Sequence, residues 1–289
     1  METETASPYL SYLNGDIKST DELTLSVKDI GVLRGYGVFD YLRTYNGEPF
    51  HLIDHIERLR HSAQQIGLEL VHETEEIAEI VYDLLEKNGA RSNEPLNVGI
   101  RLLGTGGVSP TSFTPSAGEG GLAVLIQPLG PTDPNRHATG IKLITTHLQR
   151  EFPTVKSTNY IGAIMAMREA QKVGAAEALY VDQNGEISEC TRSNIFFIKD
   201  GVLLTPENRI LEGITRKVVL NLARETMQVE IKSIYVSDLA AMDEVFITSS
   251  TKEILAVTHI DQQAIGNGQV GTITQALHAT FKKYAWGST

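Results

Sequence analysis

Lys156-Ser157-Thr158-Asn159-Tyr160 opens the stretch of sequence that decides the fold, which continues to Arg216. Its later motifs are Glu189-Cys190-Thr191-Arg192-Ser193-Asn194-Ile195-Phe196, Leu203-Leu204-Thr205-Pro206 and Leu211-Glu212-Gly213-Ile214-Thr215-Arg216. These motifs supply an amine, a carboxylate and a helix start rich in backbone amides. An amine can form a Schiff base, a carboxylate can bind a pyridinium nitrogen, and a helix N-terminus can bind a phosphate. Together they predict a pocket for pyridoxal phosphate.

Length and composition are those of an ordinary globular protein. The chain has 289 residues, which at about 100–200 residues per domain means one large domain or two modest ones. With 41% hydrophobic and 21% charged residues, it can bury a core without disulfides or metals. It contains no run of about 18 apolar residues, so we expect no membrane span.

Charge and cysteine content indicate which kinds of binding partner and which cellular compartment to expect. The net charge is −11 and no cluster of Lys and Arg appears, which argues against nucleic acid as a partner. Cys190 is the only cysteine, so no internal disulfide forms, as in a reducing compartment. The segment Met1–Thr5 is acidic and lacks a basic-then-apolar signal pattern. We therefore expect a cytoplasmic protein that binds small molecules.

A proline- and glycine-rich segment marks a boundary between two domains. Gly130-Pro131-Thr132-Asp133-Pro134-Asn135 lies between two strand-like runs and is the best linker candidate. We place a small N-terminal domain at 1–129, the linker at 130–135 and a large domain at 136–289. Hairpins and helices are mixed in both halves, which predicts an α+β fold.

Residue periodicity predicts the elements of both domains. The expected strands include 9–13, 23–27, 38–45, 96–103, 122–129, 141–146, 178–181, 195–198, 202–204, 245–248 and 254–257. The expected helices are 53–63, 74–87, 160–173, 215–227 and 270–284. In the helix at 160–173, we expect Ile161, Ile164, Met165 and Met167 to face the core.

The chain resembles the class IV aminotransferases, the fold-type-IV pyridoxal-phosphate enzymes, from Tyr9 to the final helix. The most specific part is Glu189-x-Thr191-x-x-Asn194-Ile195-Phe196, followed by Leu203-x-Thr205 and Leu211-x-Gly213-Ile214-x-Arg216. The loop between Thr205 and Leu211 is one residue shorter than is usual in the family. The resemblance implies a small N-terminal α/β domain, a larger β-barrel-like α+β domain and a homodimer.

The same resemblance implies roles for individual residues. Lys156 is similar to the Schiff-base lysine, although an exposed lysine is the ordinary alternative. Glu189 resembles the carboxylate that keeps the pyridine nitrogen protonated. The contacts with the rest of the cofactor, its phosphate included, would come from Arg58, Tyr160, Leu211, Gly213, Ile214, Thr215 and Ser250. The alternative for Gly213–Thr215 is an ordinary helix cap without a ligand, and the alternative for Tyr160 is an aromatic residue of the core.

Substrate contacts follow from the resemblance in the same way. Phe39, Tyr41, Arg43 and Arg101 are similar to residues of the substrate pocket, and the amides of Ser250 and Thr251 to the turn that meets the substrate carboxylate. Arg43 and Arg101 suit a second carboxylate such as that of 2-oxoglutarate, with an ordinary ion pair between strands as the alternative.

Signals within the family disagree about the substrate. Asn159-Tyr160, Arg43 and Arg101 resemble branched-chain aminotransferases, whereas the spacing from Lys156 to Asn159 is more similar to D-amino acid aminotransferases and aminodeoxychorismate lyases. Asp40-Tyr41 stands where the lyases carry threonines. We expect transamination of branched-chain L-amino acids with 2-oxoglutarate, with a D-amino acid aminotransferase or the lyase as alternatives.

Rival readings rest on weaker patterns. His51 and His55 have the spacing of a metal-binding pair, but no glutamate follows His51 and no third ligand is evident, so we expect no metal. Gly104-Thr105-Gly106-Gly107 suggests a nucleotide loop, but neither the lysine nor the helix of a P-loop follows. A catalytically inactive relative is a third alternative.

Overall fold

A computed structural model describes residues 9–89, 94–130 and 135–287 of the chain. It divides into two compact units, Met1–Gly130 with Val155–Asn159, and Pro131–Thr154 with Tyr160–Thr289. The predicted linker, 130–135, falls mostly on residues 131–134, which lie outside the described part. The segment around Lys156 belongs to the first unit, which the sequence did not indicate.

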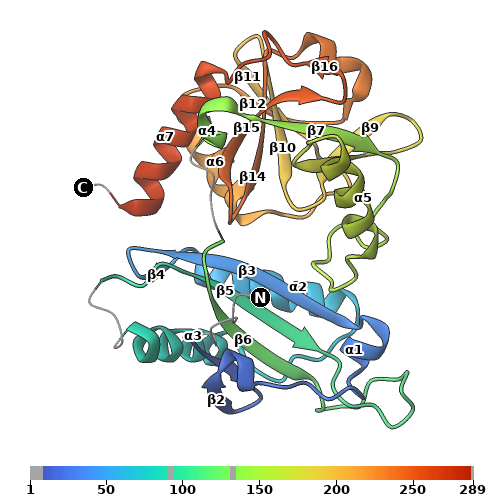
Figure 1. The fold of residues 1–289 in the computed structure, drawn as a ribbon, viewed down its shortest axis with the longest axis vertical. Helices are drawn as coiled ribbons and strands as arrows, with labels where there is room; N and C mark the ends of the chain where they lie inside the picture. Colours follow the sequence, from blue (N-terminus) through green and yellow to red (C-terminus); the bar gives the residue numbers. More distant parts are fainter. Residues whose placement is uncertain (1–8, 90–93, 131–134, 288–289) are drawn as a thin grey trace. The chain divides into compact units, whose positions relative to one another are not determined.

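The first unit is built on a six-stranded antiparallel sheet in the order β2-β1-β6-β5-β3-β4 (Figure 1). Its strands are β1 (Leu10–Leu13), β2 (Asp16–Ser19), β3 (Gly37–Tyr45), β4 (Glu48–Pro49), β5 (Val98–Thr105) and β6 (Gly121–Pro128). Its helices are η1 (Thr20–Glu22), α1 (Ile30–Arg34), α2 (Leu52–Gln65) and α3 (Thr74–Gly89). Asn14 and Gly15 both have positive φ, 49° and 97°, as a type I′ turn requires.

The hydrophobic core of this unit lies between one face of the sheet and α2 and α3. Val38 and Leu42 of β3 are fully buried, as are Ile56 and Leu59 of α2. Because side chains alternate along a strand, the intervening residues of β3 point to the other face of the sheet. That second face carries the predicted substrate residues.

The second unit contains a ten-stranded mixed sheet in the order β12-β11-β10-β14-β15-β7-β8-β9-β13, with β16 paired to β15. Its strands are β7 (Ile141–Thr146), β8 (Glu177–Val181), β9 (Glu186–Cys190), β10 (Asn194–Lys199), β11 (Val202–Thr205), β12 (Val229–Ile231), β13 (Ile234–Tyr235), β14 (Glu244–Ser249), β15 (Glu253–Ile260) and β16 (Gln263–Ala264). Its helices are α4 (Arg136–Thr139), α5 (Ile161–Lys172), α6 (Ile214–Arg224), η2 (Val236–Ala241) and α7 (Thr272–Trp286). β9 also contacts β10, far along the strand order, so the sheet curls back on itself (Figure 1). The α+β class predicted from the sequence is confirmed.

Two of the predicted elements were wrong in detail. Residues 23–27 form no strand, because β2 already makes the edge of the sheet and Val27 is exposed. In α5, Ile161, Ile164 and Met165 are 70%, 57% and 56% exposed rather than buried. The buried residues of α5 are Ala166 and Ala170, whose small side chains let the helix approach β8 closely.

Among the described helices, none combines the length and the apolar character that crossing a membrane requires.

Candidate active site

The four predicted substrate residues of the first unit share one face of its sheet. Phe39, Tyr41 and Arg43 alternate along β3 with buried residues, and Tyr41 pairs with Arg101 of β5. The guanidinium carbon of Arg101 lies 5.5 Å from the ring centres of both Phe39 and Tyr41. This face therefore combines aromatic surface with two permanent positive charges.

Tyr41 depends on a glycine in the neighbouring strand. A Cβ on Gly99 would lie 2.1 Å from the Tyr41 hydroxyl and 2.8 Å from Cζ of its ring, closer than any real contact. Burial raises the pKa of Tyr41, while the charges of Arg101 and Arg43 and a hydrogen bond with Gln127 act in the opposite direction. Gly99 and Gln127, which sequence reasoning missed, therefore set the position of the Tyr41 ring.

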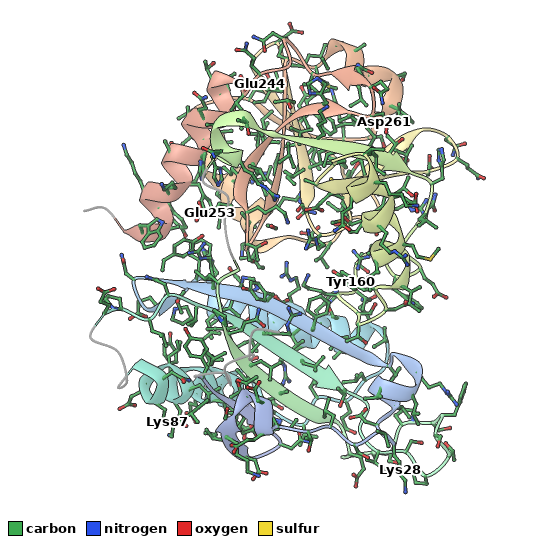
Figure 2. The ribbon with its side chains drawn as sticks, viewed as in Figure 1. Lys28, Lys87, Tyr160, Glu244, Glu253 and Asp261 are labelled. Atoms are coloured by element: carbon green, nitrogen blue, oxygen red, sulfur yellow. The ribbon has the colours of Figure 1, made fainter. Side chains whose placement is uncertain are left out.

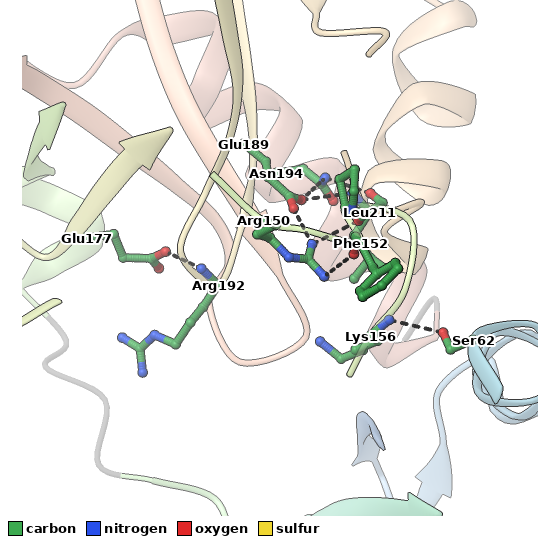
Figure 3. Close-up of polar contacts among 10 residues, drawn as sticks. Ser62, Arg150, Phe152, Lys156, Glu177, Glu189, Arg192, Asn194 and Leu211 are labelled. Carbon is green, nitrogen blue, oxygen red and sulfur yellow. Dashed lines mark hydrogen bonds and ion pairs between the residues drawn. The ribbon is translucent and has the colours of Figure 1, made fainter. Parts of the chain in front are cut away.

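Lys156 is fixed through its backbone in the first unit. Its carbonyl accepts from the Phe39 amide at 2.9 Å, and its own amide donates to Ser62 Oγ at 3.1 Å (Figure 3). The neighbouring Ser157 forms a bridge with Val38. The amine Nζ lies 4.5 Å from the centre of the Phe39 ring. The structure thus brings the predicted catalytic lysine next to the face that carries the predicted substrate residues.

Arg58 is oriented by the buried carboxylate of Asp40, to which the sequence analysis gave no binding role. Asp40 is fully buried and accepts from Arg58 Nε and Nη2, each at 2.8 Å. Its Oδ1 also lies 2.6 Å from His55 Nδ1. Burial by itself would raise the pKa of Asp40, but Arg58 and His55 hold it well below its usual range. The signal was present, since alternation along β3 puts Asp40 on the inward face, toward the helix that carries His55 and Arg58.

Glu189 is the last residue but one of β9 in the second unit and is only 4% exposed. Its Oε1 pairs with Arg150 Nη1 at 2.5 Å, and its Oε2 accepts from the Leu211 amide at 3.0 Å and from Asn194 Nδ2 at 3.3 Å (Figure 3). Asn194 also donates to the Leu211 carbonyl at 2.8 Å. Leu211, predicted as a cofactor contact, is therefore joined to Glu189 through its backbone. No sequence signal pointed to Arg150, which lies 39 residues from Glu189.

The predicted helix start at Gly213-Ile214-Thr215 is confirmed as a helix start. Gly213 is the N-cap of α6, and Ile214 and Thr215 are buried in its first turn. A Cβ on Gly213 would lie 2.0 Å from Asn194 Oδ1, so only glycine permits this approach. The first amides of a helix have no partner within the helix and carry partial positive charge. This end of α6 is suited to an anion.

Ser250 and Thr251 lie in the turn between β14 and β15. The Lys252 amide closes the turn on the Ser249 carbonyl at 3.2 Å, and Ser249 Oγ lies 3.3 Å from Thr251 Oγ1. Just before the turn, Thr248 Oγ1 is buried and has no hydrogen-bond partner among the described residues.

Tyr160 precedes α5 as its N-cap residue (Figure 2). Burial raises the pKa of its phenol, Arg150 lowers it, and the charges of Glu189 and Glu177 raise it further. Tyr160 therefore lies in the electrostatic field of the Glu189–Arg150 pair.

The rival sites find no support in the geometry. His51 Nδ1 bonds Asp54 Oδ2 at 2.7 Å, and His55 Nδ1 bonds Asp40. Within residues 9–89, 94–130 and 135–287, no three His, Cys, Asp or Glu side chains are placed to bind a metal ion. Gly104 and Thr105 are the end of strand β5 rather than the start of a phosphate loop.

Comparison with known proteins decides the family. The model of the amino-transferase class IV family matches residues 37–260, which include Lys156 and Glu189. The chain belongs to the class IV aminotransferases. This class IV aminotransferase is 37% identical over 287 residues to a Methanocaldococcus jannaschii protein provisionally named a branched-chain-amino-acid aminotransferase, covering 96% of this chain and 97% of that one. It is 34% identical over 279 residues to the D-alanine aminotransferase of Staphylococcus epidermidis, covering 94% and 96%.

Solved structures share the fold along nearly the whole chain. The branched-chain amino acid aminotransferase of Escherichia coli superimposes with a TM-score of 0.89 at 28% identity, covering 98% of this chain and 96% of that one. The branched-chain aminotransferase of Thermoproteus uzoniensis, solved with norvaline, superimposes with a TM-score of 0.86 at 30% identity, covering 96% and 95%. Both units of this chain therefore have the architecture of these enzymes.

Class IV aminotransferases use pyridoxal phosphate, and the residues of this chain fit that group. Glu189 offers a buried carboxylate to a protonated ring nitrogen. The start of α6 offers amides and the Thr215 hydroxyl to a phosphate, and the unpartnered Thr248 Oγ1 is one more polar atom beside the Ser250 turn.

Proposed function

We propose that this class IV aminotransferase uses pyridoxal phosphate to transfer the amino group of branched-chain L-amino acids to 2-oxoglutarate. The observation that carries the proposal is the face of the first sheet, where Lys156, Phe39, Tyr41 and two arginines lie together. Aromatic surface suits an apolar amino donor, and Arg101 with Arg43 suits the second carboxylate of the acceptor.

Each residue has a defined part in this proposal. The bound cofactor supplies an electron-withdrawing ring that accepts the electrons left when the α-proton leaves. Lys156 Nζ would take the proton from the substrate α-carbon as general base and then, as general acid, give it to the cofactor carbon that receives the amino group. Its backbone is held by Phe39 and Ser62, so the flexible part is the side chain alone. Glu189 would keep a proton at the ring nitrogen, and Arg150, through its ion pair, orients the Glu189 carboxylate.

The remaining residues bind and orient. Arg58, held by Asp40, and the amides at Gly213–Thr215 bind phosphate, together with the Ser250 hydroxyl. Tyr160 contacts the phenolic oxygen of the cofactor, and Leu211 packs near its ring. The Thr251 amide meets the carboxylate that every amino acid substrate carries.

We also propose a homodimer, a division into domains near 130–135 and a cytoplasmic location. The exposed apolar side chains of Ile161, Ile164 and Met165 on α5 support a second copy as partner, since large exposed apolar patches mark interaction surfaces. Sedimentation of the purified chain tests this, and a monomer at micromolar concentration contradicts it.

D-alanine transamination is the second candidate. The similarity to the Staphylococcus epidermidis enzyme supports it, as does the Lys156-to-Asn159 spacing. An absorbance titration separates the two, because the cofactor band changes when the cofactor takes up an amino group. Loss of the band with L-leucine but not D-alanine supports the branched-chain assignment, and the reverse supports the D-alanine assignment. No band after addition of pyridoxal phosphate rejects both.

A further inference from the structure

Glu177 is a fully buried carboxylate with four hydrogen-bond donors. It opens β8, and its oxygens accept from Lys252 Nζ, Ser193 Oγ and the Arg192 amide, each at 2.8 Å, and from Thr191 Oγ1 at 3.2 Å. Figure 3 shows the contact with Arg192. A buried charge is tolerated only when it is paired and its remaining lone pairs are satisfied. Burial by itself would raise the pKa of Glu177, but the charge of Lys252 and the other donors keep it below its usual value.

The four donors come from two separate turns of the second unit. Residues 191–193 join β9, which ends with Glu189 and Cys190, to β10, and the Cys190 amide closes this turn on the Ser193 carbonyl at 2.8 Å. Lys252 ends the other turn, which joins β14 to β15 and contains Ser250 and Thr251. Glu177 therefore connects two turns of the proposed site. It joins Lys252, which follows the proposed substrate-carboxylate ligand Thr251, to the turn that follows the proposed ring-nitrogen ligand Glu189.

The Ser249–Lys252 turn needs such a tie. The next residue, Glu253, has φ +56°, a left-handed conformation that is strained for a residue with a side chain and persists only where the surroundings enforce it. Glu253 is held by His278 Nε2, 3.0 Å from its Oε2. The preceding residue, Lys252, is held by its ion pair with Glu177, and its side chain is 14% exposed. The hydrogen-bonding contact at Glu253 and the ion pair at Lys252 together fix the strained end of the turn.

We propose that the Glu177–Lys252 ion pair is a positioning device for the cofactor phosphate, which fixes the Ser250 turn for that anion. The inference rests on the proposed function, because it takes Ser250 as a phosphate ligand. Lys252 is the only one of the four donors that belongs to this turn, and the other three belong to the turn after β9. Loss of Lys252 therefore affects phosphate binding and spares binding of the ring.

Two probes that differ only in the phosphate test this directly. The full-length chain, stripped of cofactor, is titrated with pyridoxal phosphate and with pyridoxal, and the ratio of the two dissociation constants is compared among variants. Lys252→Met should weaken pyridoxal phosphate about tenfold, which corresponds to 1.4 kcal/mol, and leave pyridoxal within about twofold of wild type. Lys252→Arg, which keeps the charge, should restore the wild-type ratio. Lys232→Met is the matched control, because Lys232 pairs with Glu230 at 2.8 Å on the surface, and it should change nothing.

Each result decides the matter. An unchanged ratio in Lys252→Met, or an equal weakening of both probes, overturns the positioning role. If Lys252→Met fails to fold, the double variant Glu177→Gln with Lys252→Met removes both charges at once, which is far better tolerated than one unpaired charge, and the same fall in the ratio is expected. A wild-type chain that binds neither probe contradicts the proposed function, and the positioning role with it. If wild type and Lys252→Met prefer pyridoxal phosphate over pyridoxal to the same extent, the positioning role is contradicted and the proposed function is not.

Discussion

Replacing Asp40 by asparagine should destabilise the first unit and weaken phosphate binding by Arg58. Asp40 is fully buried and is the acceptor of two bonds from Arg58 at 2.8 Å and the partner of His55 at 2.6 Å. Asparagine keeps the shape but removes the charge, and its amide group faces donors. Removing one partner of a buried ion pair costs about 3–5 kcal/mol. At about 2–4 °C per kcal/mol for chains of this size class, the Tm should fall by roughly 6–20 °C.

The matched control is Asp54→Asn on α2, the helix that carries His55 and Arg58. Asp54 pairs with His51 at 2.7 Å, but both side chains are 24% exposed, and exposed pairs contribute at most about 1 kcal/mol. Both variants are followed by thermal unfolding without cofactor, and then by titration with pyridoxal phosphate. Asp40→Asn should bind it at least about tenfold more weakly, because Arg58 loses its orientation. Equal Tm values for the two variants, within about 2 °C, would refute the reasoning.

Three further predictions follow from single contacts. Gly99→Ala should displace the Tyr41 ring, destabilise the chain by about 1–3 kcal/mol and raise KM for the amino donor without changing cofactor affinity; wild-type stability and KM would contradict this. Burial lowers the pKa of His55 below its ordinary 6.5, so its contribution to stability is present above pH 6.5 and lost as the pH falls. Urea unfolding at pH 7.5 and 5.5 should therefore show a smaller loss of unfolding free energy at the lower pH for His55→Gln than for wild type. Equal losses would exclude His55 as the group responsible. Glu189→Gln should slow removal of the α-proton on the order of 10²-fold in single-turnover measurements, and an unchanged rate would remove Glu189 from the ring nitrogen.

Local features of the fold were predictable because they depend on neighbours in sequence. Asn14-Gly15 predicts a turn with positive φ at both residues, and Gly213 predicts where α6 begins. In α5, however, helical periodicity of apolar residues predicted the wrong core face. The helix packs through Ala166 and Ala170, and whether a helix packs through its large or its small side chains depends on how close the neighbouring strand lies, which no local pattern states.

The sequence motifs of the candidate site were predictable, but the residues that position the motif side chains were not. The ordered motif around Glu189 identified the carboxylate, but its partner Arg150 stands in a segment without a pattern of its own. Gly99 looked like an ordinary strand glycine until the Tyr41 ring was seen to occupy the space of its missing Cβ. Such partners are set by strand pairing and helix packing, so only the folded chain shows them.

Borohydride reduction of the chain with bound pyridoxal phosphate, followed by peptide mapping, tests the central claim most directly. Reduction makes the bond between the cofactor and its lysine permanent, so the modified residue can be read from the peptide mass. We predict one modification, on Lys156, and none in Lys156→Ala. Modification of another lysine, or of none, would contradict the assignment of Lys156 as the residue that bonds the cofactor and moves the proton.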